Sequence, residues 1–171
     1  MPESENTLYL DLDAGRVTIR LLPDVAPNHV ARIKELVREG FYDGIVFHRV
    51  IDGFMAQTGD PTGTGRGGSD KPNLPAEFSK MPFERGTLGA ARTQNPNSAN
   101  SQWFICFDRA PHLNGQYTVF GQVVAGMEHV DALQRGEPPA KPSSIRSLRV
   151  ASDVGADDRD LDDSDLDDGE E

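Results

Sequence analysis

A glycine-rich run is the first residue pattern in this chain that could support chemistry. Residues 63–68 read Gly-Thr-Gly-Arg-Gly-Gly, which matches the GxGxxG pattern of dinucleotide-binding loops. In a nucleotide site, such a loop follows a strand and opens a helix whose N-terminus holds the pyrophosphate. Here Pro72 and Pro75 follow, and no helical periodicity appears. The run therefore favours a flexible surface loop.

The residues that could bind a metal or act as a nucleophile lack the spacing that these roles need. A zinc site would have to draw on four histidines that are not spaced as a zinc motif, namely His29, His48, His112 and His129. Residues 163–167 resemble the start of an EF-hand loop, but Asp168 stands where the turn glycine belongs. Cys106 is the single cysteine and has apolar neighbours, so we expect a small buried hydrophobe. No GxSxG elbow is present, and we expect neither a metal nor a cofactor.

Length and charge limit the classes of protein to consider. The chain has 171 residues, enough for one domain, and a net charge of -11. Residues 152–171 contain eleven acidic residues and one arginine, so the rest of the chain is nearly neutral. This distribution argues against the broad basic surface of a nucleic-acid-binding protein. The chain has no run of about 18 apolar residues and begins with acidic residues, so we expect a cytoplasmic protein without a membrane segment.

Two periodicities predict the elements that must position a site. Apolar residues alternate with polar ones over residues 8–21, on either side of a turn at residues 13–15, which predicts a β-hairpin. Over residues 27–39 the apolar residues fall at helical spacing. Pro27 suits the first turn of that helix and Gly40 suits its C-terminal cap.

Short apolar runs separated by glycine follow, and they predict a β-barrel or a β-sandwich. These runs occupy residues 45–50, 54–58, 87–91, 103–107 and 119–124. A second helix is expected at about residues 127–135, and a last strand near residues 147–151. From Asp153 onward the chain is rich in Asp and nearly free of large apolar groups, so we expect disorder there.

One segment resembles the signature of a known family. Residues 47–60 read FHRVIDGFMAQTGD, which is similar to the signature of the cyclophilins. SQWFI at residues 101–105 and HLNGQYTVFG at residues 112–121 resemble later cyclophilin blocks, in the same order. FYDG at residues 41–44 also fits.

This resemblance covers about residues 7–151, with residues 1–6 as an N-terminal extension and residues 152–171 as an acidic tail. It implies a mainly β fold, a closed eight-stranded antiparallel β-barrel capped by two α-helices. It also implies a peptidyl-prolyl cis/trans isomerase that acts on proline-containing peptides and on unfolded or folding proteins. A barrel of this sort offers no obvious oligomer seam, so we expect a monomer.

The resemblance implies that Arg49 is the catalytic residue. Rotation about an X-Pro bond needs no covalent chemistry, but the twisted state returns a lone pair to the prolyl nitrogen. An arginine stays charged at any working pH and offers its donors in a rigid fork. Strand neighbours point to opposite faces, so His48 should face away from the site, and we interpret it as structural.

Ten residues occupy positions that correspond to the substrate-binding positions of the family: Phe54, Met55, Gln57, Arg92, Thr93, Gln102, Phe104, His112, Leu113 and Tyr117. The apolar members would bury the proline ring, and the two glutamines would bind the substrate backbone and orient Arg49. His112 stands where many eukaryotic members carry a tryptophan that contributes to cyclosporin binding, so we expect weak cyclosporin binding. Tyr117 replaces a histidine of those members, and Arg92-Thr93-Gln94 replaces a smaller, more neutral stretch at the rim of the pocket. These changes make the chain look closer to bacterial cyclophilins.

Two other functions stay open at this point. A binding module could grip proline-containing segments in the same pocket without turning them over, although it would have no need for a donor such as Arg49. The acidic tail could recruit a basic partner, or it could keep the protein soluble.

Overall fold

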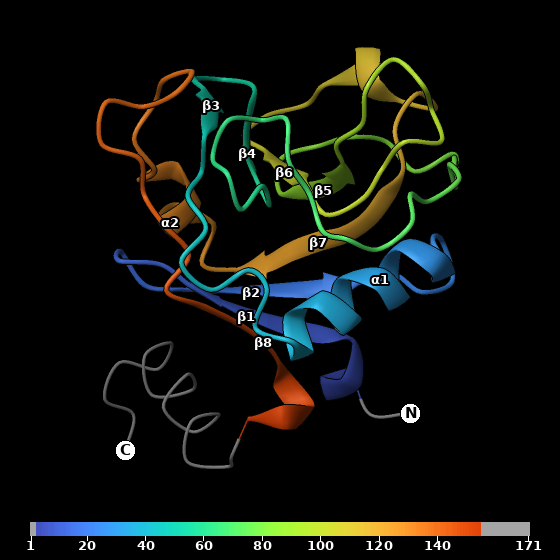
Figure 1. Ribbon diagram of the computed structural model, residues 1–171, viewed down its shortest axis with the longest axis horizontal. Coiled ribbons are helices and arrows are strands. Elements are labelled where there is room, and N and C mark those ends of the chain that lie inside the picture. The colour runs from blue at the N-terminus through green and yellow to red at the C-terminus, as the bar shows by residue number, and fades with distance from the viewer. Residues whose placement is uncertain (1–2, 155–171) are drawn as a thin grey trace.

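The computed structural model describes residues 3–154, and its main feature is one antiparallel β-sheet (Figure 1). The strands are β1 (Thr7–Asp11), β2 (Arg16–Leu21), β3 (Arg49–Ile51), β4 (Met55–Thr58), β5 (Thr87–Ala90), β6 (Trp103–Cys106), β7 (Val119–Ala125) and β8 (Ser147–Val150). The α-helices are α1 (Pro27–Arg38) and α2 (Met127–Asp131). The short 3-10 helices are η1 (Glu3–Asn6), η2 (Pro111–Leu113) and η3 (Ala151–Asp153).

β1 and β2 form the predicted hairpin because their alternating apolar side chains enter the core. Leu8 lies opposite Ile19, and Leu10 lies opposite Val17. All four side chains are at most 1% exposed. Full burial of a side chain of this size contributes about 1.5–3 kcal/mol to folding. The alternation of apolar and polar residues therefore reflects the burial that stabilises the hairpin, and the predicted β-hairpin is confirmed.

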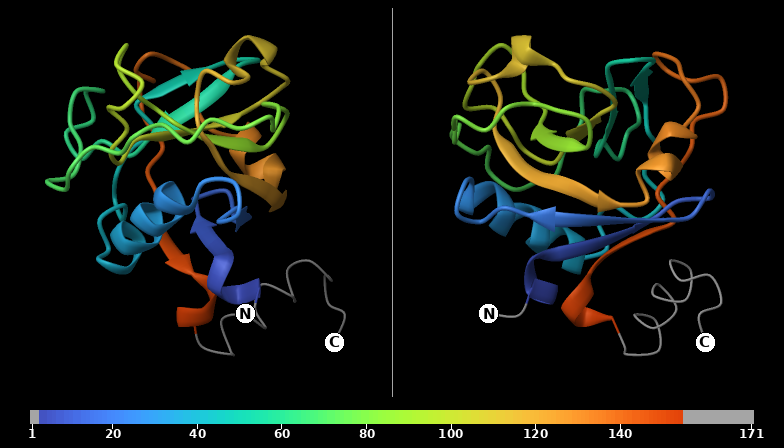
Figure 2. Two further views of the ribbon diagram at one scale, coloured as in Figure 1. Left: turned by 90° about the vertical axis from the view of Figure 1, so that its right-hand side faces the viewer. Right: turned by 180° about the vertical axis from the view of Figure 1, so that it is seen from behind.

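The sheet runs in the order β3-β4-β6-β5-β7-β2-β1-β8 and is curled (Figure 2). Within the described residues, the edge strands β3 and β8 do not pair directly. Instead, the backbone N–H of Gly44 donates to the carbonyl of Ile145, and that of Phe47 donates to Ser143. The expected eight-stranded antiparallel fold with two α-helices is confirmed, with short backbone bridges joining the edges of a curled sheet.

The strand expected at residues 45–50 is largely replaced by these bridges. Only Arg49–Ile51 pairs with β4, while Val46 makes an isolated bridge to Ser144. Phe47 is nevertheless fully buried. The apolar run thus correctly indicates that residues of this segment are buried. The length of the strand, however, depends on partners that are distant in the sequence.

α1 packs its apolar face against the sheet, as its periodicity predicts. The buried apolar residues of this face are Val30, Ile33, Leu36 and Val37. The first backbone N–H groups of a helix lack partners within the helix. Here Glu77 accepts hydrogen bonds from the N–H groups of Asn28 and His29, at 3.1 and 2.8 Å. Gly40 follows the helix with a φ of 74°, a conformation that favours glycine.

α2 ends at Asp131, four residues earlier than the sequence suggests. In a longer helix, the Asp131 carbonyl would accept the backbone N–H of Arg135. Instead, Nη1 of Arg135 donates to the carbonyls of Asp131 and Leu133, at 2.7 Å each. The guanidinium thus satisfies carbonyls that further helical turns would otherwise have used.

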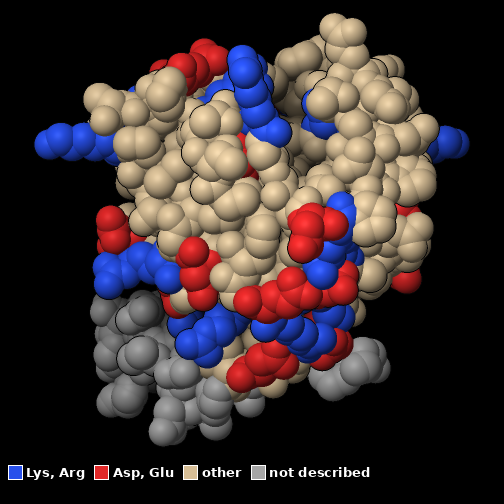
Figure 3. Space-filling view, in the orientation of Figure 1, with Lys and Arg blue, Asp and Glu red and all other residues tan. Residues whose placement is uncertain are grey.

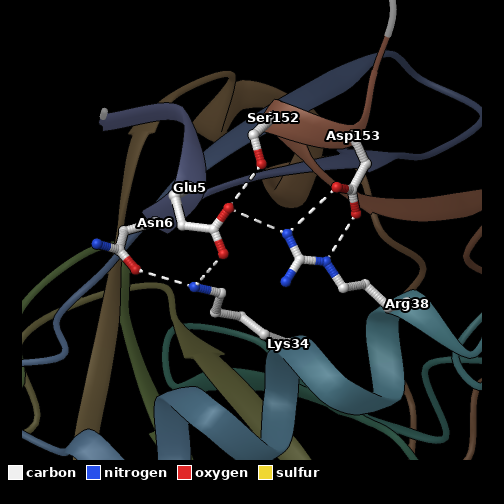
Figure 4. Close-up of polar contacts among 6 residues, drawn as sticks. All are labelled: Glu5, Asn6, Lys34, Arg38, Ser152 and Asp153. Atoms are coloured by element: carbon white, nitrogen blue, oxygen red, sulfur yellow. Dashed lines mark hydrogen bonds and ion pairs between the residues drawn. The ribbon is translucent and has the colours of Figure 1, made fainter. Parts of the chain in front are cut away.

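The two ends of the described chain meet beside α1 (Figure 4). Glu5 pairs with Lys34 at 2.8 Å and with Arg38 at 3.1 Å, and Arg38 pairs with Asp153 at 2.8 Å. Val154 is buried against Tyr9 and Ala151. Asp153 and Val154 therefore belong to the folded part of the chain, and the expectation of disorder from Asp153 is corrected for them. The rest of the acidic tail, residues 155–171, lies outside the described residues.

Acidic and basic side chains alternate over α1 on the face shown in Figure 3, while the upper part of this face is mostly uncharged. Lys71, for example, pairs with Glu35 at 3.4 Å and with Glu39 at 2.9 Å. Opposite charges this close together do not form a patch of a single sign. In the described part of the chain, no helix has the length and apolar character needed to cross a membrane.

Candidate active site

Three neighbouring strands align polar and aromatic side chains on one face of the sheet. Arg49 on β3 pairs with Gln57 on β4, and Gln57 pairs with Phe104 on β6. Residues directly opposite each other in antiparallel strands project from the same face. Met55 lies two residues before Gln57 and shares that face. The register of the sheet thus brings together residues that are far apart in the sequence.

These side chains border a pocket of about 110 Å³. The pocket is lined by Arg49, Phe54, Met55, Gln57, Ala91, Arg92, Phe104, Leu113 and Tyr117. All of these except Ala91 are among the site residues expected from the sequence. Pockets for drug-sized ligands are several times larger, so this one has room for a single small group.

The floor of the pocket is apolar and firmly packed. Phe104 and Met55 are 4% and 2% exposed. The Phe104 ring stacks on Phe83 at a centroid distance of 5.8 Å and meets the Tyr117 ring edge-on at the same distance. Leu113, the last residue of η2, packs into the same apolar cluster. Aromatic contacts of this kind fix the rings, so the shape of the floor is preorganised.

The guanidinium of Arg49 forms hydrogen bonds through two of its three nitrogens. Its Nε donates to Oε1 of Glu137 at 3.3 Å, and its Nη1 donates to Oε1 of Gln57 at 3.3 Å. Gln57 in turn donates through Nε2 to Oε1 of Gln102 at 2.9 Å. The Arg49 side chain is 44% exposed, so it stays accessible from the pocket side.

The glycine-rich run is a loop organised by one buried carboxylate. The backbone N–H groups of Thr62, Thr64, Gly65 and Gly67 all donate to Asp60. Burial alone would raise the pKa of Asp60, but these hydrogen bonds favour its ionised form and together lower the pKa. Nε2 of Gln102 donates to the carbonyls of Gly65 and Gly67, at 3.0 and 2.9 Å. The loop therefore supports the glutamine pair behind Arg49 and does not open a helix.

A wider hollow of about 550 Å³ adjoins the apolar pocket and shares Gln57, Ala91 and Arg92 with it. Two further expected site residues, Thr93 and Gln102, line this hollow. The guanidinium of Arg92 lies 4.4 Å above the Tyr117 ring, and its Nη2 donates to the carbonyl of Gln116 at 2.6 Å. Arg92 is thus fixed at the boundary between the two hollows.

Two histidines lie apart from the pocket lining. His112 is exposed, and its ring packs against Phe54 at 5.3 Å between centroids. His48 is 6% exposed, and neither ring nitrogen has a hydrogen-bond partner among the described residues. Burial lowers the pKa of His48, so the neutral ring is favoured. His48 does not line the pocket, in line with its interpretation as structural.

Sequence reasoning missed Glu137 and Ala91. Glu137 reaches Arg49 from the segment after α2, 88 positions along the chain. The residues around Glu137 follow neither a period of two nor a helical period, so no local pattern indicates its place. Ala91 ends one of the predicted apolar runs, and that run could have suggested it.

The described residues offer no centre for metal or thiol chemistry. They contain no group of three or more His, Cys, Asp or Glu that could hold a metal ion. Cys106 is fully buried, and burial raises the pKa of its thiol to about 12. The thiolate is therefore disfavoured at physiological pH, and Cys106 packs as an apolar residue.

Comparison with known proteins assigns the family. Residues 7–150 match the family described as cyclophilin type peptidyl-prolyl cis-trans isomerase/CLD. A probable peptidyl-prolyl cis-trans isomerase of Brucella suis is 59% identical over 145 residues, which cover 78% of this chain and 74% of that protein. Peptidyl-prolyl cis-trans isomerase B of Bacillus subtilis is 40% identical over 130 residues, which cover 75% of this chain and 90% of that protein.

The fold agrees with a solved structure of the same family. The crystal structure of a cyclophilin from Hirschia baltica matches with a TM-score of 0.83 and 29% sequence identity. The match covers 90% of this chain and 76% of that one. The chain therefore belongs to the cyclophilin-type peptidyl-prolyl cis-trans isomerases, as its sequence signature indicated.

Proposed function

We propose that this isomerase acts on proline-containing segments of peptides and folding proteins, with Arg49 as the donor to the prolyl nitrogen. The reaction is slow without a catalyst because resonance gives the C–N bond a rotation barrier of about 18–20 kcal/mol. No covalent bond forms or breaks during the rotation. Catalysis therefore requires only that the enzyme bind the twisted amide more tightly than the planar one.

The apolar pocket suits the proline ring. Its walls include Phe54, Met55, Phe104 and Leu113. The ring carbons need no hydrogen bonds, so an apolar pocket can bury them without leaving a polar group unpaired. Each buried CH₂ group stabilises the complex by about 0.8 kcal/mol. With the ring held, the acyl side of the X-Pro bond can turn over the wider hollow next to it.

Arg49 suits the stabilisation of the twisted state. In the planar amide, the nitrogen lone pair is delocalised into the carbonyl, and rotation returns it to the nitrogen. An N–H group aimed at that nitrogen then gains a charge-assisted hydrogen bond that the planar state lacks. Arg49 borders the pocket, and two of its nitrogens are engaged by Gln57 and Glu137. Its remaining donors are available to the substrate.

The expected rate acceleration indicates how much transition-state stabilisation Arg49 has to supply. A 10⁵-fold acceleration requires roughly 7 kcal/mol, since each tenfold requires about 1.36 kcal/mol. One preorganised donor in an active site contributes about 2.7–4 kcal/mol. The rest has to come from holding the ring in the pocket and from hydrogen bonds to the substrate backbone. Gln57 and Gln102 are suited to the backbone contacts because neutral amides do not compete for the charge of Arg49.

The observation that carries this proposal is the position of the Arg49 guanidinium at the edge of an apolar pocket. Separate measurement of kcat and KM with an Ala-Pro test peptide tests the proposal. Arg49→Ala should lower kcat and change KM little, while Phe104→Ala should mainly raise KM. Arg149→Ala, on the exposed face of β8, is the matched control and should change neither. Native kcat in Arg49→Ala would refute the proposed role.

A further inference from the structure

We propose that Glu137 is a positioning residue for the reaction, because its carboxylate holds Nε of Arg49 and leaves Nη2 for the substrate. This inference rests on the proposed role of Arg49 and extends it to a residue outside the pocket lining. Glu137 lies in the segment between α2 and β8, which contributes no residue to the lining of the pocket.

The backbone brings Glu137 to Arg49. Val50 and Gly136 exchange two backbone hydrogen bonds of 2.8 Å each, so the residue after Gly136 lies beside the residue before Val50. Gly136 has a φ of 144°, and a Cβ at this position would lie 2.5 Å from Cα of Pro139. Glycine is therefore needed for this close approach. The contact between Glu137 and Arg49 thus follows from a fixed backbone pairing.

A second ion pair holds the same segment on the other side of Gly136. Nε of Arg135 pairs with Oδ1 of Asp52 at 3.0 Å, and its guanidinium lies 4.2 Å above the Phe107 ring. Arg135 and Glu137 therefore contact the β3–β4 hairpin through their side chains, and Gly136 contacts it through its backbone. This arrangement limits how far the carboxylate of Glu137 can move from Arg49.

The two bonds to Arg49 determine the orientation of its guanidinium. The group is planar, so fixing Nε and one Nη fixes the plane of the fork. Glu137 fixes Nε and Gln57 fixes Nη1, each at 3.3 Å. Within the described residues, Nη2 donates to no acceptor. Nη2 is therefore the donor that the geometry leaves for the prolyl nitrogen.

The exposure of the pair indicates when it matters. The side chains of Arg49 and Glu137 are 44% and 56% exposed, and ion pairs exposed to water contribute little to the stability of a protein. A bound peptide excludes water from the pocket and lowers the local dielectric constant, which strengthens the pair. The effect should therefore appear in turnover of the bound peptide more than in the stability of the free protein.

A double-mutant cycle tests this inference on the Ala-Pro test peptide. Glu137→Ala should lower kcat about fivefold, which corresponds to the loss of one partly exposed ion pair, with little change in KM. Glu137→Gln should recover part of the loss, because its amide oxygen can still accept from Nε. In an Arg49→Ala background, Glu137→Ala should have no further effect, because its partner is gone.

Asp13→Ala is the matched control, since it breaks an exposed ion pair with Arg146, 3.1 Å long, that lies outside this segment. It should leave kcat unchanged. The inference is overturned if Asp13→Ala lowers kcat as much as Glu137→Ala, or if the Glu137 effect persists in the Arg49→Ala background. Those outcomes leave the role of Arg49 intact, whereas native kcat in Arg49→Ala alone refutes both proposals.

Discussion

Arg49 and Gln57 face each other across the β3–β4 ladder, and Nη1 of Arg49 donates to Oε1 of Gln57 at 3.3 Å. Gln57 also donates to Gln102, whose own amide donates to the carbonyls of the loop around Asp60. The orientation of the guanidinium is thus linked to a buried carboxylate through two neutral amides.

We predict that Gln57→Ala lowers kcat for an Ala-Pro peptide about tenfold, because one edge of the fork loses its partner. Thermal unfolding should change little, since Gln57 is only partly buried. Gln122→Ala is the control, because this glutamine lies on β7 and bonds to Thr87 and the Arg85 carbonyl. A Gln57→Ala enzyme with native kcat would show that Arg49 does not need this support.

We predict that kcat is flat from about pH 6 to about pH 9, because the proposed donor is an arginine, which stays charged throughout. Burial lowers the pKa of His48 and favours its neutral ring, which has no part in the proposed mechanism. Exchange rates at saturating peptide, measured across the range, provide the check. A step near neutral pH that disappears in His48→Asn would instead indicate a role for histidine in turnover.

Acid should weaken the contacts between the two chain ends. Hydrogen bonds from Arg38, then from Lys34, lower the pKa of Glu5 from 4.5 to about 2. Because the pKa is lower in the folded state, Glu5 stabilises the fold above its ordinary pKa, and this contribution is lost as pH falls from about 4.5 through about 2. In denaturant titrations, Glu5→Gln should lower the free energy of unfolding at pH 7 and have little effect near pH 2.

Glu84→Gln is the control for that titration. Glu84 is exposed, and its carboxylate makes no ion pair within the described residues. A Glu5→Gln effect of the same size at pH 7 and near pH 2 would mean that the charge of Glu5 does not contribute to stability.

Cyclosporin affinity should depend on His112. Its ring is exposed beside Phe54, so a larger apolar ring there would extend the apolar surface next to the pocket. We predict that His112→Trp binds cyclosporin about tenfold more tightly, with isomerase activity largely retained. Arg109→Trp, an exposed change near η2, controls for added surface. Equal affinity in the native protein and His112→Trp would rule out this role.

Local patterns in the sequence predicted the helix and the strands whose apolar spacing directly reflects which side chains are buried. The alternation over β1 and β2 and the helical spacing of α1 both reflect side chains that enter the core. The resemblance to the family placed Arg49, Gln57 and Phe104 in one site, and the strand register brings them together. The spacing of apolar residues is therefore enough to predict a helix or a strand that buries one face in the core.

Features that depend on distant partners could not be predicted in this way. The shortness of β3 follows from backbone bridges to residues near 144. Glu137 meets Arg49 only because Gly136 pairs with Val50. No sequence window contains both partners, so no local pattern reports these contacts.

The most direct test of the account is the cis-to-trans rate of an Ala-Pro peptide while it is bound to the protein. Exchange NMR at saturating peptide can compare the native protein with Arg49→Ala at matched occupancy. If Arg49 stabilises the twisted amide, the bound-state rate falls at least about a hundredfold, while the dissociation constant of the peptide changes little. An equal bound-state rate in the two proteins would contradict the account, because rotation would then proceed without this donor.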